Sequence, residues 1–295
     1  MAKFLDKAFM LTLGALSETP LGQVAYKMMR SQPIAPKKLL LFPEIRPHNT
    51  QELHLTAHRG LSGIHPENTA VSFEAGGKAG FYALECDTHC AADGTWMVVH
   101  DPEISTLFGA KGDVKSYTYD ELMKIDMVKG ANVEKYPHTH MCTLQEYIDI
   151  CKKYNCRPMI EIKDKRLDKM QDLYKLLEKN DIVGSCILIS FHYDVLVQMY
   201  NINPQLELWH LINNISQKKI DEAKQYGFGI AFCAAYNADR PEMIKKIHEA
   251  GLTAACWTVD SKELLDKMMD AGVKYITSNT ILPTQEAYDL FTKAN

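Results

Sequence analysis

The chain has 295 residues, of which 46% are hydrophobic, and this length suits one large α/β domain. Its formal net charge of −4 provides no polybasic surface, so nucleic acid is not an expected partner. The eight cysteines lack the paired CxxC spacing of structural zinc sites, and no disulfide framework is expected at this size. Free thiols favour a reducing compartment, so we expect a cytoplasmic protein.

Residues 1–50 are predicted to form a helical arm followed by a connector. Charged residues at positions 3, 6 and 7 fall on one side of the first helix and apolar residues on the other, which is an amphipathic pattern. The apolar part, residues 8–16, is shorter than the roughly 20 residues that span a bilayer. We expect the arm to pack on the body of the protein. Peripheral contact with a membrane surface, or dimerisation, is the less favoured alternative, and the oligomeric state stays open. Four prolines in residues 31–49 indicate an extended connector.

From residue 53 onwards, short apolar runs alternate with helical stretches. Strands are predicted at residues 53–58, 82–89, 157–163, 186–191, 206–212, 227–233, 252–259 and 274–279. Helices are predicted at residues 68–79, 143–154, 167–179, 193–201, 216–226, 241–250 and 261–271. A ninth run, 95–100, is interpreted as an extension beside the second strand, and an irregular insertion follows it at 101–141. Eight βα units of this kind predict a (β/α)8 TIM barrel over residues 51–295.

Polar and aromatic residues gather at the carboxyl ends of these strands, where TIM barrels carry their active sites. They are His58 and Arg59 on the first strand, Glu85 and Asp87 on the second, His100 and Asp101 on the extension, Glu161 and Lys163 on the third, and Trp257 on the seventh. On a regular strand, His58 and Arg59 would point to opposite sides. We therefore predict that the strand ends at His58 and that the chain turns at Gly60, which tolerates unusual backbone angles.

Three of these residues are carboxylates that are predicted to share one site. Side chains alternate along a strand, so Glu85 and Asp87 point the same way, and Glu161 comes from the neighbouring strand. This oxygen-rich group predicts a site for one divalent cation, Mg²⁺ or Ca²⁺. Arg59 and Lys163 either neutralise the carboxylates as salt bridges or contact a phosphate that the cation also holds, and we favour the second interpretation.

The residues lie in a series of motifs that resembles the glycerophosphodiester phosphodiesterase family. Over residues 53–283 the motifs follow the family order: AHRG (57–60), PENT (66–69), ECD (85–87), DGTWMVVHD (93–101), EIK (161–163), SF (190–191), CWTVD (256–260) and ITSN (276–279). No single motif is decisive, but the ordered set is specific. Two departures are AA at 91–92 and Asn279, where many members carry an acid. We expect both near the outer group of the substrate.

The resemblance implies roles for individual residues. His58 and His100 match the catalytic histidines, and Glu85, Asp87 and Glu161 match the ligands of one divalent cation. Arg59 and Lys163 match phosphate contacts, Trp257 matches an aromatic side chain of the pocket, and Glu67 matches an acid that orients groups of the site. We expect Asp101 to support the site in the same way.

The implied activity is hydrolysis of glycerophosphodiesters to sn-glycerol 3-phosphate and an alcohol. Histidine suits both proton transfers because its usual pKa is about 6.5. We favour His58 as the base and His100 as the acid, although the sequence does not decide the order. One alternative is a lipid-directed enzyme, a lysophospholipase D or a phospholipase C-like phosphodiesterase, in which residues 101–141 and the N-terminal arm accept an acyl chain. Another is a catalytically silent barrel that only binds phosphorylated ligands. The preferred head-group alcohol stays open.

Overall fold

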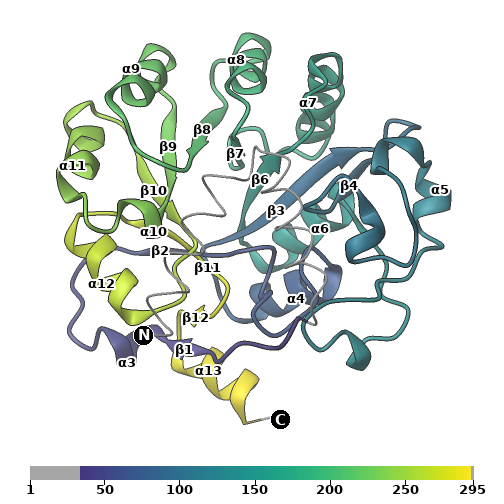
Figure 1. The fold of residues 1–295 in the computed structure, drawn as a ribbon, viewed down its shortest axis with the longest axis horizontal. Coiled ribbons are helices and arrows are strands. Elements are labelled where there is room, and N and C mark those ends of the chain that lie inside the picture. Colours follow the sequence, from purple (N-terminus) through teal and green to yellow (C-terminus); the bar gives the residue numbers. More distant parts are fainter. Residues whose placement is uncertain (1–33, 294–295) are drawn as a thin grey trace.

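A closed barrel of eight parallel strands forms the centre of the protein (Figure 1). The computed structural model describes residues 34–293. The barrel strands are β2 (His54–Ala57), β3 (Ala83–Cys90), β6 (Arg157–Ile162), β7 (Ile187–Ser190), β8 (Glu207–Ile212), β9 (Gly229–Cys233), β10 (Ala254–Trp257) and β11 (Tyr275–Ser278). Each pairs with the next in this order, and β11 pairs with β2 to close the ring. The predicted (β/α)8 TIM barrel is confirmed.

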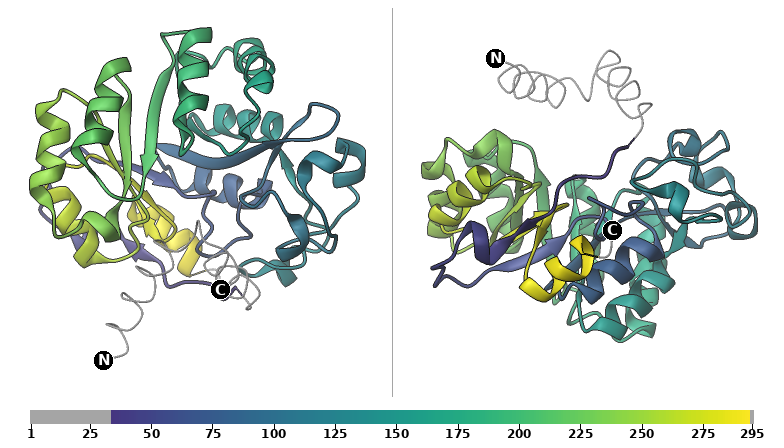
Figure 2. Two further views of the ribbon diagram at one scale, coloured as in Figure 1. Left: turned by 45° about the horizontal axis from the view of Figure 1, so that its top comes forward. Right: turned by 90° about the horizontal axis from the view of Figure 1, so that it is seen from below.

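Helices surround the barrel and connect its strands (Figure 2). They are α4 (Ala70–Lys78), α6 (Leu144–Tyr154), α7 (Met170–Lys179), α8 (Tyr193–Ile202), α9 (Gln217–Tyr226), α11 (Pro241–Glu249), α12 (Lys262–Asp270) and α13 (Gln285–Thr292). Short helical turns add α10 (Ala234–Asn237) and a 3₁₀ turn at Leu167–Lys169. Side-chain caps fix several helix starts: Thr143 and Glu146 form a capping box on α6. All seven predicted helices are present within three residues of their expected ends, whereas α13 was not predicted.

Both faces of the barrel sheet are buried, as expected for parallel strands covered by helices. Every residue of β3 is buried. Outward side chains pack against the helices in the largest apolar cluster, and a smaller cluster that includes Met159, Trp209 and Leu211 lies inside the barrel. Strand direction places all carboxyl ends of the eight strands at one rim, where the predicted site residues meet.

The segment after β3 forms a separate lobe at the side of the barrel, at the right of Figure 1. Strand β4 (Trp96–Val98) pairs antiparallel with the end of β3, and β5 (Cys142–Thr143) pairs with β4. Between them lie α5 (Tyr119–Leu122) and 3₁₀ turns at Ile104–Thr106, Val114–Ser116 and Val133–Lys135. The lobe has its own apolar cluster, which includes Phe108 and Leu122. The predicted insertion at 101–141 therefore has a core that is separate from that of the barrel.

The connector before the barrel is only partly extended. Strand β1 (Leu40–Leu41) pairs in parallel with β12 (Ile281–Leu282), and α3 (Phe42–Ile45) follows it. Pro43 lies in the first turn of α3, where its missing N–H costs no hydrogen bond. The expectation of a wholly extended connector was therefore wrong. The predicted helical arm lies in residues 1–33, outside the described residues. Among the helices of residues 34–293, none combines the length and apolar character needed to cross a membrane.

Candidate active site

The chain turns sharply after β2, and this turn brings His58 and Arg59 to the same rim. The strand ends at Ala57, one residue earlier than predicted. Arg59 and Gly60 both have left-handed backbone angles, with φ of 56° and 74°. A Cβ at Gly60 would lie 2.5 Å from the carbonyl carbon of Ser72, so only glycine fits there. The predicted turn is confirmed, and Arg59 takes part in it.

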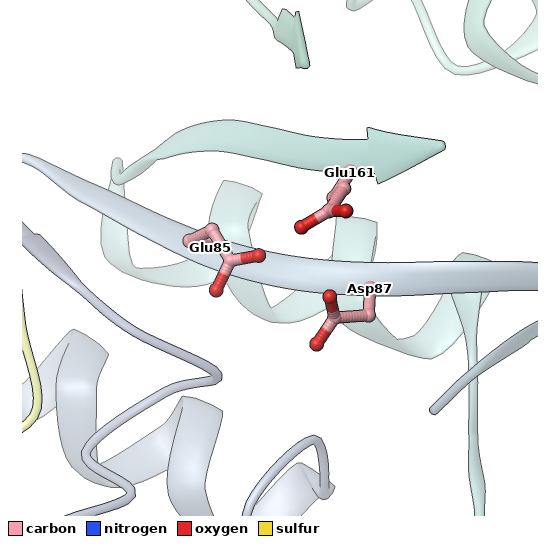
Figure 3. Close-up of side chains that lie close together, drawn as sticks. All are labelled: Glu85, Asp87 and Glu161. Atoms are coloured by element: carbon pink, nitrogen blue, oxygen red, sulfur yellow. The ribbon is translucent and has the colours of Figure 1, made fainter. Parts of the chain in front are cut away.

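Three buried carboxylates from the adjacent strands β3 and β6 converge on one site (Figure 3). Asp87 and Glu161 are register partners on these adjacent strands, and Glu85 lies two residues before Asp87 on the same side of β3. Each side chain offers one oxygen within 4.8 Å of the other two. The predicted convergence of Glu85, Asp87 and Glu161 is therefore present, and we call these residues the carboxylate trio.

Two positively charged side chains, which we call the two cationic side chains, lie against the carboxylate trio. Lys163 Nζ is 2.9 Å from Glu161 Oε1 and 3.3 Å from Asp87 Oδ1. Arg59 Nε is 3.2 Å from Asp87 Oδ2, and its backbone N–H donates to Glu85 Oε2 at 2.9 Å. The salt-bridge contacts that the sequence offered as an alternative are thus formed. They do not exclude contact with a phosphate, because both cations also line the cavity described below.

Two residues of the PENT motif hold this arrangement from behind. Glu67 Oε1 accepts a hydrogen bond from Arg59 Nη1 at 2.9 Å, as expected for an orienting acid. Asn68 Nδ2 donates to Asp87 Oδ2 at 2.8 Å, a contact that sequence reasoning missed. Asn68 has a left-handed φ of 57°, which asparagine tolerates better than most residues. Its position next to Glu67 in the motif was the available signal.

Burial and mutual repulsion separate the pKa values of the carboxylate trio. Burial and the neighbouring charge of Asp87 raise the pKa of Glu85 well above its usual range. Burial also raises the pKa of Glu161 to about 7, against the effect of Lys163. Burial opposes ionisation of Asp87 as well, but Lys163 and Arg59 hold its pKa well below the usual range. When all three carboxylates are ionised, the carboxylate trio together with Arg59 and Lys163 carries one net negative charge.

A chain of hydrogen bonds fixes the orientation of His58. Asn279 donates from Nδ2 to Asp260 Oδ2 at 2.6 Å and from its backbone N–H to Asp260 Oδ1 at 2.8 Å. The Asn279 amide oxygen therefore faces His58 Nδ1, 2.8 Å away, and only a protonated Nδ1 can donate to it. His58 Nε2 then keeps its lone pair on the side of Glu85, whose Oε2 is 3.9 Å away. Asn279 thus lies behind His58. The sequence had suggested a different position, near the outer group of the substrate.

The Nδ1 atom of His100 lies beside a carboxylate, whereas the Nδ1 atom of His58 lies beside an amide. Asp101 Oδ1 lies 2.7 Å from His100 Nδ1, so Asp101 is placed to orient this histidine. Burial and the charge of Arg59 lower the pKa of each histidine to about 4. At neutral pH both rings are therefore neutral, and each has its Nδ1 held by an oxygen.

The histidines, the cations and two of the carboxylates face one cavity of about 630 Å³. Trp257 lines it as predicted, and its ring meets Phe191 edge to face with centroids 5.6 Å apart. Among the described residues that line the cavity, none belongs to the 101–141 insertion. The lipid-directed alternative, in which this insertion would accept an acyl chain, gains no support from the lining, because side chains of the insertion pack into their own cluster.

The chain is similar to known phosphodiesterases in sequence. A model of the Glycerophosphoryl diester phosphodiesterase family matches residues 58–282. The glycerophosphodiester phosphodiesterase of Bacillus subtilis is 27% identical over 292 residues, which cover 92% of this chain and 93% of the relative. The protein of the same name from Bacillus altitudinis is 28% identical over 74% of this chain and 90% of its own length.

The fold is similar to that of solved structures. An Oleispira antarctica phosphodiesterase in complex with the product sn-glycerol-3-phosphate matches with a TM-score of 0.72 and 22% identity, over 80% of this chain and 96% of that chain. A glycerophosphodiester phosphodiesterase from Parabacteroides distasonis matches with a TM-score of 0.68 and 26% identity, over 84% and 100%. Because the family model spans well over half of the sequence and its motif residues meet at one rim of the barrel, the chain belongs to the glycerophosphoryl diester phosphodiesterase family.

Proposed function

We propose that the protein hydrolyses glycerophosphodiesters to sn-glycerol 3-phosphate and an alcohol, with one divalent cation and two histidines that carry protons. The observation that carries this proposal is the position of His58 and His100. Both line the cavity beside the carboxylate trio, and both have Nδ1 held by an oxygen so that Nε2 is the reactive nitrogen. The names of the relatives, and the product held by the Oleispira antarctica structure, support the substrate class.

The carboxylate trio fits a hard divalent cation, Mg²⁺ or Ca²⁺. Its donors are all carboxylate oxygens, whereas zinc prefers histidine or cysteine ligands. The net charge also fits, because a divalent cation would change one net negative charge into one net positive charge, which complements a singly charged phosphodiester. When bound, such a cation would neutralise charge on the phosphoryl oxygens. Glu85, Asp87 and Glu161 would hold it.

In the proposed mechanism, His58 Nε2 takes the proton of the glycerol 2-hydroxyl, whose oxygen attacks phosphorus. The bond from phosphorus to the head-group oxygen breaks, and His100 gives a proton to the departing alcohol. His100 takes up this proton when the anionic substrate binds, because the phosphate offsets the charge of Arg59 that otherwise lowers the pKa of the histidine. The bond cleavage leaves a cyclic phosphate, which water opens with the two histidines in exchanged roles. Arg59 and Lys163 stabilise the charge that develops on the phosphoryl oxygens.

The partners of the two histidines support this order. The Asp101 carboxylate stabilises a protonated imidazole, which suits His100 as the acid. The Asn279 amide carries no charge and holds His58 in the tautomer that accepts a proton at Nε2, which suits a base. A silent binding barrel would not need two histidines that are oriented in this way.

The test is an assay for released product. Glycerophosphocholine and glycerophosphoethanolamine are incubated with the chelated protein, alone and with added Mg²⁺ or Ca²⁺, and glycerol 3-phosphate and the cyclic intermediate are followed by phosphorus NMR. Release of glycerol 3-phosphate only with the cation is the expected result. Absence of product from both substrates, with either cation, would contradict the proposed function.

Replacement of each histidine tests its role. His58→Ala and His100→Ala should each lower turnover by at least about 100-fold, the usual scale for a general acid or base. His138→Ala is the matched control, since His138 is an exposed histidine of the insertion. Its turnover should stay near that of the native protein. Near-native turnover of either active-site variant would remove that histidine from the mechanism.

A further inference from the structure

The insertion at 101–141 contacts the catalytic rim, although none of the described residues that line the cavity comes from it. A loop of the insertion, residues 127–139, returns to the barrel and meets the loop that joins β2 to α4, residues 58–69. We call residues 127–139 the brace loop and residues 58–69 the β2–α4 loop. The β2–α4 loop carries His58, Arg59 and the PENT motif, so the brace loop touches a segment that belongs to the active site.

The brace loop is closed at its base and folded on itself. The Met127 N–H donates to the Thr139 carbonyl at 2.7 Å. The 3₁₀ turn Val133–Lys135 forms its tip, and the Thr139 hydroxyl donates to the Tyr136 carbonyl at 2.8 Å. Because these hydrogen bonds fix the shape of the brace loop, it can hold the residues that it contacts.

Two side chains of the brace loop form hydrogen bonds with the β2–α4 loop. Asn132 Nδ2 donates to the Ile64 carbonyl at 2.9 Å. The Tyr136 hydroxyl lies 2.9 Å from His65 Nδ1, and the two ring centroids are 5.6 Å apart. Burial and the charge of Lys135 lower the pKa of His65 to about 4, so the neutral ring can accept the tyrosine proton at Nδ1.

The third contact between the two loops is close packing. Gly130 is buried, and an added Cβ would lie 3.0 Å from the Cβ of Pro66 and 3.1 Å from its Cα. The brace loop therefore holds residues 64–66 of the β2–α4 loop from the outside. On the barrel side, the Gly63 N–H donates to the Asn279 carbonyl at 3.1 Å. The middle of the β2–α4 loop is thus fixed between the barrel and the insertion.

The next two residues of the β2–α4 loop hold the catalytic groups. Glu67 accepts a hydrogen bond from Arg59 at 2.9 Å. Asn68 donates to the Asp87 carboxylate at 2.8 Å and accepts from the Asp87 backbone N–H at 3.3 Å. Only one peptide bond separates Pro66 from Glu67, so a displacement of residues 64–66 would displace both of these contacts.

We propose that Asn132 and Tyr136 are positioning residues, through which the insertion keeps Glu67 and Asn68 in the geometry that hydrolysis requires. This inference rests on the proposed function and gives the insertion a role in it. Neither residue lines the cavity, so both act through the β2–α4 loop. Without them this loop would occupy several conformations, and only the fraction with an aligned active site would turn over substrate.

The first experiment removes the two hydrogen bonds. Asn132→Gly deletes the amide and suits the left-handed φ of 54° at this position, and Tyr136→Phe deletes only the hydroxyl. The double variant should lower kcat for glycerophosphocholine by about 5- to 30-fold, up to the population shift that two ordinary hydrogen bonds provide. KM should change by less than about twofold, because neither residue touches the cavity. A near-native kcat in the double variant would overturn the inference.

Matched control variants separate positioning from a general loss of stability. Asn155→Gly changes an exposed asparagine with a left-handed φ of 53° at the end of α6. Tyr174→Phe deletes a hydroxyl on α7 that accepts a hydrogen bond from Asn203 at 3.2 Å. Both controls should keep a near-native kcat well below their melting temperatures. A brace-loop double variant that melts earlier but matches the controls in kcat would show a purely structural role and overturn the inference.

A binding measurement separates this inference from the proposed function. Mg²⁺ is titrated by calorimetry into the chelated native protein, the brace-loop double variant, Asn68→Gly, and the combination of all three changes. Removing a residue that orients a metal ligand costs at least about tenfold in affinity, so the brace-loop changes, one step further away, should raise Kd at least about threefold. In Asn68→Gly the brace-loop changes should have little further effect, because they act through Asn68.

The outcomes of the two experiments are distinct. An unchanged Kd in the double variant, or losses that simply add to those of Asn68→Gly, would overturn the inference. A native protein that binds Mg²⁺ but turns over no glycerophosphodiester would contradict the proposed function, and the rise in Kd would still support the brace loop. Native turnover and native Kd in the double variant would remove the brace loop and keep the proposed function.

Discussion

Arg59 contacts two acids, Glu67 of the PENT motif and Asp87 of the carboxylate trio. Its side chain contacts Glu67 at 2.9 Å and Asp87 at 3.2 Å, on two sides of one guanidinium group. A lysine ammonium is a single point of charge and cannot reproduce this planar fork. Arg59 therefore holds neighbouring acids in place and also faces the cavity. Substitutions can distinguish its structural role from its role in catalysis.

We predict that Arg59→Lys folds normally but loses turnover by about 10- to 100-fold, the range for a hydrogen bond to a charged group. Arg59→Ala should lose more and should also melt at a lower temperature, because Glu67 and Asp87 lose a buried partner. Turnover, melting temperature and inhibition by inorganic phosphate are measured for both. An active Arg59→Lys beside a merely destabilised Arg59→Ala would show that Arg59 only holds the loop.

The raised pKa of Glu161 predicts how the affinity for a divalent cation depends on pH. Its pKa of about 7 means that it is largely protonated below that pH in the metal-free protein, and a cation must displace the proton. The affinity for Mg²⁺ should therefore rise as the pH increases through about 7, with proton release on binding. Calorimetric titrations in two buffers with different ionisation enthalpies measure both quantities. An affinity that does not change with pH would contradict the assignment of Glu161 as a ligand.

The same pKa has a consequence for stability, with a definite sign. The folded protein raises the pKa of Glu161 from 4.5 to about 7, so folding favours the protonated form. This contribution is complete below pH 4.5 and is lost as the pH rises to about 7. Relative to Glu161→Gln, the chelated native protein should thus show a falling melting temperature across this window. A constant difference between the two melting curves would contradict the raised pKa.

Residues from four segments, including that of His58, meet at this end of the barrel. Their positions along the sequence do not predict that they are neighbours. His58 follows β2, Asn279 follows β11, Asp260 follows β10, and Lys37 precedes β1. Lys37 Nζ lies 2.8 Å from Asp260 Oδ2, which in turn holds the Asn279 amide at 2.6 Å. An acid at position 279 would place two carboxylates in contact. The amide of Asn279 is therefore matched to Asp260.

This match predicts a double-mutant result. Asn279→Asp should lower kcat by about tenfold or more, since two touching carboxylates repel each other and displace His58. Adding Asp260→Asn exchanges acid and amide and should recover much of the loss. kcat, KM and melting temperature are measured for the two single variants and the double variant. Additive losses in the double variant would show that residues 260 and 279 do not act as a pair.

On the scale of the whole molecule, the carboxylate trio connects two strands that the long insertion separates in sequence. Glu85 and Asp87 belong to β3, and Glu161 belongs to β6. A cation held by all three binds only the folded barrel, so it should stabilise the entire protein. The insertion, with its separate core, leaves this connection intact.

We predict that a saturating divalent cation raises the melting temperature of the chelated protein by roughly 5 °C. This corresponds to about 2.7 kcal/mol at a concentration 100-fold above Kd. Asp87→Asn should abolish the shift, and calorimetry with elemental analysis provides the measurement. Full activity after exhaustive chelation, with no bound metal, would contradict a cation-dependent mechanism.

The sequence by itself determined the eight βα units and most of the site residues. Both are local signals: apolar periodicity predicts strands and helices, and strand ends mark the catalytic rim. Thus all eight barrel strands and the clustering of His58, Glu85, Asp87, His100 and Glu161 were predicted correctly. The short helix α3 and helix α13 were missed because connector and terminal segments carry weaker periodicity.

Only the tertiary structure decided which side chains touch. Asn279 contacts both Asp260 and His58. Asn279 and His58 are more than 200 positions apart in the sequence, and they meet only because β11 pairs with β2 and closes the barrel. The shape of the cavity likewise depends on Ala231 and Ala255, which line it and lie in register on two strands. In the sequence these alanines are ordinary strand residues. Register and ring closure are set by the packing of the complete barrel, so a pattern read along one segment cannot contain them.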